Sequence, residues 1–357
     1  MLNVNNLMSV FKVSCIFIGT IVGAGLASGK EIYQFFSVYG LSSFFGLIIC
    51  FFMYVFIGNM VCDICNKKNL SSYDLLINEI CPKIPAKILN SFVGLYYLFS
   101  SSIIFAASGS IINQFFSIPN ILGIILMIVV SVIILKFSMK GLVLINSLSV
   151  PIMICLIFII FIMFELFLKP IDIETLSLLT FKDNGIRLHN NIILSCILYG
   201  GFNILSATGI LSSLATQHKR SNFKKGIFIG SLLLILISMI INYLILSNMP
   251  YIAKYDIPLL YISRIFGKVF QLIILVLIWV EMLSTETSSL YSLAKSISNK
   301  YKISLFKSIL LILVISIPIS IIGFTKLISI IYPLFGLLGV VFIYYIIKYK
   351  YIKKKGI

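Results

Sequence analysis

Ten apolar stretches follow one another along the chain, separated by shorter polar segments. They cover residues 10–36, 41–62, 88–116, 121–136, 141–167, 191–216, 222–246, 268–298, 303–322 and 324–347. A helix needs about 20 predominantly apolar residues to cross the hydrocarbon core of a bilayer. The pattern therefore predicts an all-α integral membrane protein with ten transmembrane helices. The polar segment 70–81 is expected to form a short amphipathic helix on the inner side.

The composition agrees with this assignment. The chain of 357 residues is 60% hydrophobic and 11% charged, with a mean hydropathy of +1.12, and a soluble core of this size does not need so little charge. The formal net charge is +17, but the basic residues lie in short clusters between apolar stretches. This indicates loops held against an anionic inner leaflet, and it argues against nucleic-acid binding.

Charge also predicts the orientation. With both termini in the cytoplasm, twenty of the 28 basic residues fall on the inner side, as the positive-inside rule requires. Segment 168–190 then becomes an external loop, and 348–357 a basic cytoplasmic tail. The expected location is the bacterial cytoplasmic (inner) membrane.

The spans repeat with an offset of about 180 residues, so the first five (1–167) correspond to the last five (191–347). Five is an odd number, and the second set must therefore lie inverted in the membrane. A glycine-containing interruption recurs at the same offset, because Ala27-Ser28-Gly29 corresponds to Ala207-Thr208-Gly209. Paired interrupted helices in inverted halves point to a transporter's midplane binding site.

The first interruption lies in GTIVGAGLASGKEIYQFF, residues 19–36. Glycine weakens a helix by roughly 1 kcal/mol relative to alanine, and a broken helix in lipid requires a cavity or other protein around it. Exposed N–H groups of the helix restarting near Ala27 would suit a substrate carboxylate. The alternative is that these glycines only allow close helix packing.

A second polar feature lies in the eighth span, where Glu281, Thr285, Ser288, Ser292 and Lys295 share one helical face. Such an oxygen-rich face on an apolar helix is expected to look into the bundle. Serine and threonine in helices also bond their own preceding carbonyls, so a structural role for these hydroxyls stays open.

The ten inverted spans, with spans one and six broken, resemble the LeuT fold of the amino acid–polyamine–organocation superfamily. VGAGLASGKEIYQFF resembles the opening motif of the YkvI-like bacterial membrane proteins, which are proposed amino acid permeases. The resemblance implies a sodium- or proton-coupled carrier of small organic solutes that works by alternating access. It implies sodium ligands at Gly19, Val22, Thr285, Ser288 and Ser289. It further implies substrate contacts at Gly23, Ala24, Gly25, Leu26, Ala27, Ser28, Tyr97, Tyr199, Gly200, Gly201, Phe202 and Asn203.

Ionisable residues inside a membrane mark functional sites by default. Glu281 is the candidate for proton coupling, whereas Glu286 lies about 140° round the helix and is expected to pair with a loop cation. Lys30 and Glu31 are candidates for an external gate, and Lys30 could instead extend to the interface. Residues 141–164 contain no Lys or Arg, which favours sodium over a proton as the coupling ion.

The sequence therefore predicts a secondary active transporter for a small amino acid or similar zwitterion, with sodium favoured over a proton as the coupling ion and with no other cofactor. A membrane receptor for amino acids, of the spore-germinant type, is the alternative from another class, and a proton-coupled carrier of another small solute is a further one. An enzyme is disfavoured, because the only histidines, His189 and His218, lie in or beside loops.

Overall fold

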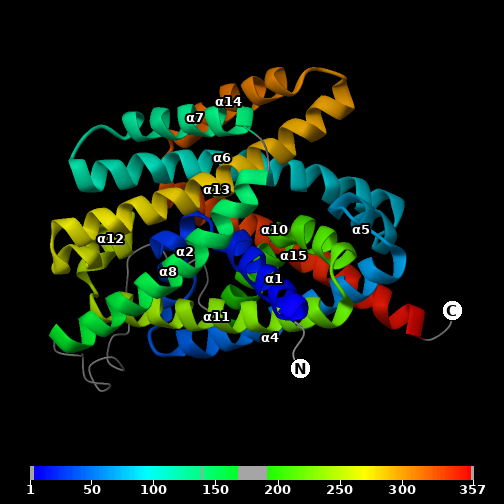
Figure 1. Cartoon of the computed structure of the whole chain (residues 1–357), viewed down its shortest axis with the longest axis horizontal. Coiled ribbons are helices and arrows are strands. Elements are labelled where there is room, and N and C mark those ends of the chain that lie inside the picture. The colour runs from blue at the N-terminus through cyan, green and yellow to red at the C-terminus, as the bar shows by residue number, and fades with distance from the viewer. Residues whose placement is uncertain (1–3, 138–139, 168–190, 355–357) are drawn as a thin grey trace.

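The computed structural model describes residues 4–137, 140–167 and 191–354, and these form a bundle of helices (Figure 1). The helices are α1 Val4–Ile21, α2 Ala24–Ser28, α3 Lys30–Phe35, α4 Ser42–Lys68, α5 Tyr73–Ile80, α6 Lys83–Phe116, α7 Asn120–Phe137, α8 Lys140–Phe167, α10 Ile192–Gln217, α11 Arg220–Ser247, α12 Pro258–Ser263, α13 Lys268–Tyr301, α14 Leu305–Ser320 and α15 Phe324–Lys354. The predicted external loop 168–190 lies outside the described residues.

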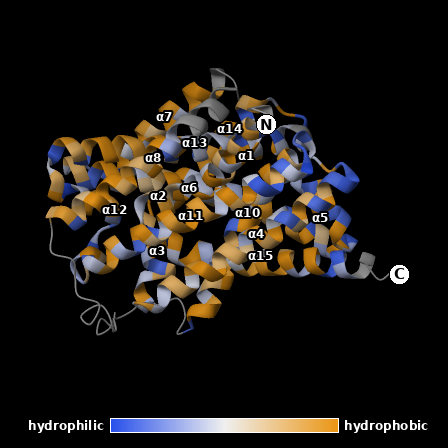
Figure 2. Cartoon of the chain, turned by 60° about the horizontal axis from the view of Figure 1, so that its bottom comes forward, coloured by the Kyte–Doolittle hydropathy of each residue, from blue (hydrophilic) through white to orange (hydrophobic). Residues whose placement is uncertain are grey.

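Each of the ten predicted spans contains helix. In the described part, seven helices are long and apolar enough to cross a membrane, namely α4, α6, the 149–167 part of α8, α10, α11, α13 and α15. The apolar helical stretches of α1, α7 and α14 are shorter than these seven, at 10–17 residues each. The predicted amphipathic segment is helix α5, which lies at the opposite end of the bundle from α12 (Figure 1). Hydrophilic residues gather around α5, whereas long stretches of the other helices are hydrophobic (Figure 2).

Helix contacts repeat between the two halves. The contact between α1 and α8 has its counterpart in α10 with α15, and α4 with α10 has its counterpart in α11 with α1. The pairs α6–α7 and α6–α15 correspond in the same way to α13–α14 and α13–α8. This correspondence is the packing expected of two five-helix units related by a pseudo-two-fold axis.

The first predicted break is present. Helix α1 ends at Ile21, and α2 begins at Ala24, earlier than the expected restart near Ala27. Gly29 then separates α2 from α3 with φ +83°, a left-handed conformation that a side chain makes unfavourable. The first span is thus three helical pieces in succession.

The second predicted break is absent, so this prediction is wrong. Helix α10 runs without interruption from Ile192 to Gln217. Its glycines serve close packing instead, because a Cβ on Gly201 would lie 2.9 Å from the Gly336 carbonyl oxygen of α15. A Cβ on Gly339 would lie 2.0 Å from the Gly201 carbonyl oxygen. Small residues let the two backbones approach, as in many membrane helix pairs.

Candidate functional site

The interruption after α1 leaves two residues outside helical geometry. The N–H of Val22 still donates to the Ile18 carbonyl at 2.9 Å, and Gly23 then turns the chain away with φ −22° and ψ −166°. The Gly23 carbonyl accepts the N–H of Ala27 at 3.2 Å, which starts α2. The backbone therefore changes direction at a single glycine.

This interruption faces the polar side of α13. A Cβ built on Gly23 would lie 3.6 Å from Cγ2 of Thr285, so the glycine and this threonine are in van der Waals reach. The Thr285 hydroxyl donates to its own helix at the Glu281 carbonyl, 3.1 Å away. The prediction that the polar face of α13 looks into the bundle is confirmed at this residue.

A cavity of about 820 Å³ lies beside the interruption and is lined by Thr285. Its walls come from α1, α5 and the turn before it, α6, α10 and α13. The lining residues are Lys12, Ile16, Gly19, Thr20, Ser71, Ser72, Tyr73, Tyr96, Tyr97, Ser206, Gly209, Ile210, Ser213, Leu214, Gln217, His218, Thr285, Ser288, Ser289, Tyr291, Ser292 and Lys295. The cavity volume is that of ordinary small-molecule sites.

The structure brings most of the predicted ion ligands together on this cavity. Gly19 of α1 and the three hydroxyl residues Thr285, Ser288 and Ser289 of α13 all line it. Val22 is fully buried beside them and does not line the cavity. Hydroxyl and carbonyl oxygens of this kind are the ligands that hard cations prefer, so the donor set fits a sodium ion.

One end of the cavity is basic and lies near α5. Lys12 and Lys295 line it there, as does His218, whose Nδ1 lies 2.7 Å from the Ser9 hydroxyl oxygen. Burial, together with the nearby charge of Lys12, lowers the pKa of His218 below its usual value. The histidine is therefore neutral at pH 7, and the positive charge at this end comes from lysines.

A cluster of aromatic rings packs against the cavity at Tyr96. The Tyr96 ring lies 5.8 Å from Phe202 and 5.4 Å from Phe335, measured between ring centroids. Phe202 in turn stacks on Tyr332 at 4.2 Å. This aromatic cluster joins α6, α10 and α15, so the predicted contact residue Phe202 packs behind Tyr96 and does not itself line the cavity.

Behind the aromatic cluster lies the Glu31 carboxyl group. It accepts a hydrogen bond from the Tyr199 hydroxyl at 3.2 Å, and Tyr332 is a second hydroxyl partner. Its side chain folds back onto α2, because a Cβ on Gly25 would lie 2.0 Å from Glu31 Oε1. Glu31 is only 2% exposed. The sequence placed no acid at the substrate residues, whereas the fold brings one against them.

Lys30 points elsewhere, toward the segment between α11 and α13. Its Nζ donates to the Tyr255 carbonyl at 2.8 Å and lies 5.1 Å from the centroid of the Tyr33 ring. The lysine is 1% exposed. Lys30 therefore attaches the broken first span to a loop rather than extending to an interface.

The same loop is held by other helices. The Ile257 N–H donates to the Gln114 side chain of α6 at 3.1 Å, and that side chain donates back to the Ile257 carbonyl at 3.0 Å. Asp256 accepts hydrogen bonds from Ser110 of α6, at 2.8 Å, and from Thr325 of α15. Sequence reasoning missed Asp256, which lies in a loop with no motif around it. Together these bonds close this end of the bundle.

The remaining predicted substrate residues lie outside the cavity. Ala24, Leu26, Ala27 and Ser28 are buried in α2, and the Ser28 hydroxyl donates to the Gly25 carbonyl at 2.9 Å. In α10, Gly200 packs on α4, because its Cβ would lie 2.7 Å from Met53 Cε. Asn203 donates to the Tyr54 hydroxyl oxygen at 2.9 Å. Tyr97 is the predicted substrate residue that lines the cavity.

Two carboxyl groups of α13 are buried in the bundle. Glu281 is 1% exposed and lies beside Ser149 of α8. Glu286 is fully buried beside Ser101 of α6, and neither of its oxygens has a hydrogen-bond partner among the described residues. The expected pairing of Glu286 with a loop cation is therefore wrong, because α6 covers this face of α13. Its burial could not be read from helix periodicity alone.

Comparisons with known proteins agree with this architecture. No protein-family model matches the chain. The chain is 27% identical over 337 residues to the uncharacterized membrane protein YkvI of Bacillus subtilis (strain 168), covering 94% of each protein. The structure resembles the inward-facing conformation of Mhp1, with TM-score 0.64 and 10% identity, over 92% of this chain and 73% of that one.

It also resembles a Na⁺-coupled sialic acid symporter in a substrate-bound outward-open state, with TM-score 0.58 and 14% identity. That match covers 90% of this chain and 72% of the symporter. The chain is thus similar to YkvI in sequence and has the LeuT-like fold of these secondary active transporters.

Proposed function

We propose that this protein is a secondary active transporter that carries a small amino acid or similar zwitterion across the cytoplasmic membrane, coupled to sodium. In this proposal ten helices span the membrane as two inverted five-helix repeats, 1–167 and 191–347, with both termini in the cytoplasm. The paired helix contacts of the two halves support the repeat. The solved transporters of similar fold support the class.

The observation that carries the proposal is the meeting of the α1 interruption with the hydroxyl face of α13 at one cavity. Gly19 of α1 and Thr285, Ser288 and Ser289 of α13 line one cavity, and Gly23 lies against Thr285. A sodium ion held there, with Val22 completing the set, would tie α1 to α13. Its binding would thereby favour one arrangement of the two helices over another, which is the requirement for coupling.

The substrate would bind between this ion site and the aromatic cluster. Its carboxylate would meet the backbone of Gly23 to Ser28, and Tyr97 would contact it from the cavity wall. The Glu31 carboxyl lies on the opposite side of α2, next to Tyr199. It offers an anionic partner for a substrate ammonium group once the aromatic cluster opens. A zwitterion matches this distribution of charge better than a simple anion.

The position of the cavity opening indicates which side of the membrane the site faces. It opens at the end near α5, where Lys12 and Lys295 lie, whereas the opposite end is closed by the loop that Lys30 contacts. With the termini in the cytoplasm, the structure corresponds to an inward-open state. Lys30 then acts in the outer closure, as expected for a gating residue.

Thermal unfolding of the purified protein tests the proposal. A panel of amino acids would be added in sodium and, separately, in potassium at equal ionic strength. A ligand present at 100 times its Kd stabilises the native state by about 2.7 kcal/mol. We expect stabilisation by at least one amino acid that requires sodium and is lost in Ser289→Ala. Ser329→Ala is the matched control, because this serine lies outside the cavity and its hydroxyl donates to the Lys326 carbonyl at 2.9 Å.

Stabilisation by an amino acid that depends on pH and not on sodium would instead favour a proton-coupled carrier, with Glu281 as the group to substitute. Stabilisation without uptake into proteoliposomes would favour the receptor. No stabilisation by any amino acid in either salt would contradict the proposed substrate class.

A further inference from the structure

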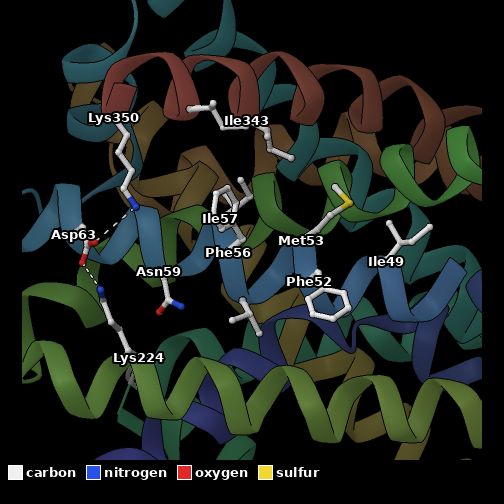
Figure 3. Close-up of a pocket in the computed structure, with 12 residues that line it drawn as sticks. Ile49, Phe52, Met53, Phe56, Ile57, Asn59, Asp63, Lys224, Ile343 and Lys350 are labelled. Carbon is white, nitrogen blue, oxygen red and sulfur yellow. Dashed lines mark ion pairs between the residues drawn. The ribbon is translucent and has the colours of Figure 1, made fainter. Parts of the chain in front are cut away.

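A second cavity lies on the outer surface of the bundle, away from the candidate site. It is a groove of about 610 Å³ between α4, α11 and α15. Figure 3 shows its floor and walls, with Phe52, Phe56 and Ile343 among the side chains along it. Phe52 and Phe56 are 64% and 51% exposed. In a membrane protein such a surface faces lipid.

One end of the groove is lined by charged side chains, unlike its apolar length. There Asp63 of α4 lies between Lys224 of α11 and Lys350 of α15, as Figure 3 shows. The Lys224 Nζ is 2.7 Å from Asp63 Oδ1, and Arg220 also contacts this oxygen at 2.8 Å. Three cations therefore share one carboxylate, which leaves an excess of two positive charges at this end.

Lys350 is the least engaged of these cations. Its Nζ lies 3.9 Å from Asp63 Oδ2, at the limit of an ion pair, and its side chain is 39% exposed. The same Nζ lies 6.0 Å from the centroid of the Phe56 ring. Lys350 thus stands where the apolar groove meets the charged end. Asn59 adds a polar group here, with an Oδ1 that has no hydrogen-bond partner among the described residues.

The dimensions fit one lipid chain. The groove follows α4 from Ile49 to Asp63, about 21 Å at 1.5 Å per residue. The hydrocarbon of a single leaflet is about 15 Å thick, half of the bilayer core. An acyl chain would therefore lie along the apolar part while its headgroup reaches the lysines, and basic pockets between transmembrane helices bind anionic headgroups in this way.

We propose that this groove binds one anionic phospholipid, with an acyl chain along Phe52, Phe56 and Ile343 and the headgroup phosphate at Lys350 and Lys224. The lipid would join α4, α11 and α15 at the end of the molecule that also holds α5. The inference does not depend on what the protein transports. It rests on the pairing of an apolar groove with an excess of positive charge.

Native mass spectrometry of the full-length protein in detergent tests the proposal, with phosphatidylglycerol as the probe and phosphatidylcholine as the neutral comparison. We expect one phosphatidylglycerol to bind more tightly than phosphatidylcholine. Near a membrane surface each lysine contributes about 1 kcal/mol to binding of an anionic lipid, which is about fivefold in affinity. Lys350→Gln should therefore weaken phosphatidylglycerol binding about fivefold, and Lys224→Gln/Lys350→Gln roughly 30-fold.

Two further variants separate the groove from general surface charge. Lys307→Gln removes an exposed lysine at the start of α14, outside the groove, and should leave binding unchanged. Ile343→Trp fills the apolar part while keeping both lysines, and it should lower binding of phosphatidylglycerol at least as much as Lys350→Gln. Each variant's unfolding midpoint in detergent without added lipid confirms that it is folded.

An equal loss of binding in Lys307→Gln and Lys350→Gln would overturn the proposal, because attraction would then follow total charge. Unchanged binding in Ile343→Trp would overturn it as well, since the headgroup would be held without a chain in the groove. Equal affinity of the wild-type protein for the two lipids would have the same consequence.

Discussion

Gly25 and Glu31 make the sharpest prediction about the broken first span. In Gly25→Ala, the new Cβ would lie 2.0 Å from Oε1, 2.3 Å from Cγ and 2.4 Å from Cδ of Glu31. Because three atoms of the side chain clash, the carboxyl group has to leave its place. Glu31 is 2% exposed, so it cannot move into water without separating the helices around it.

The expected cost follows from these contacts. Overpacking a filled site destabilises by about 1–3 kcal/mol, and leaving a buried polar group without its hydrogen-bond partner costs about 1–3 kcal/mol. Alanine recovers up to about 1 kcal/mol of helix propensity relative to glycine. We therefore expect Gly25→Ala to lower the free energy of unfolding by about 2–4 kcal/mol.

A double-mutant cycle isolates the contact. In Glu31→Ala the clashing atoms are gone, so adding Gly25→Ala to this variant should change stability by less than about 1 kcal/mol. Unfolding would be followed in detergent for all four proteins under one condition. An equal cost of Gly25→Ala in both backgrounds, or no cost in the wild-type background, would refute the described position of Glu31.

Three more predictions follow from other contacts. Gly339→Ala should destabilise the protein by about 3 kcal/mol, the upper end of the usual cost of overpacking, because its Cβ would meet the Gly201 carbonyl oxygen of α10. Gly94→Ala should not, since its Cβ would find only Leu293 Cδ1 at 3.9 Å; equal unfolding midpoints for the two variants would contradict this. Lys30→Met removes the hydrogen bond to the Tyr255 carbonyl. A cysteine introduced into the loop between α11 and α12 should then react about tenfold faster with an impermeant maleimide added outside. An unchanged rate would speak against an outer closure. Epitope tags on both termini should be protected in intact cells and become accessible only after the membrane is opened, and access from outside would reverse the proposed orientation.

Much of the helix arrangement could be predicted because the bilayer fixes the length of an apolar stretch. The glycines around Gly23 correctly indicated a broken first span. Glycine content predicted a break at Gly201 wrongly, because a glycine in a membrane helix can either interrupt the helix or allow the backbone of a neighbouring helix to approach closely. Only the presence of Gly339 at the contact distinguishes the two, and α15 follows α10 by more than a hundred residues.

The candidate site could be predicted in part. Thr285 and Ser288 belong to the polar face that the 3.6-residue period predicts, so their position on one cavity follows from local spacing, whereas Ser289 was expected only from the family resemblance. The contacts of Glu31 with Gly25, Tyr199 and Tyr332 depend instead on how three segments pack. The burial of Glu286 has the same origin, because its face of α13 is covered by α6. Neither arrangement leaves a local pattern in the sequence.

Uptake into proteoliposomes tests the central claim most directly. The purified protein would be reconstituted, and accumulation of the radiolabelled amino acid that stabilises it would be measured with an inward sodium gradient or with equal sodium on both sides. The account predicts concentrative uptake that requires the gradient and is lost in Ser289→Ala but kept in Ser329→Ala. Uptake that is identical with and without the sodium gradient would contradict it.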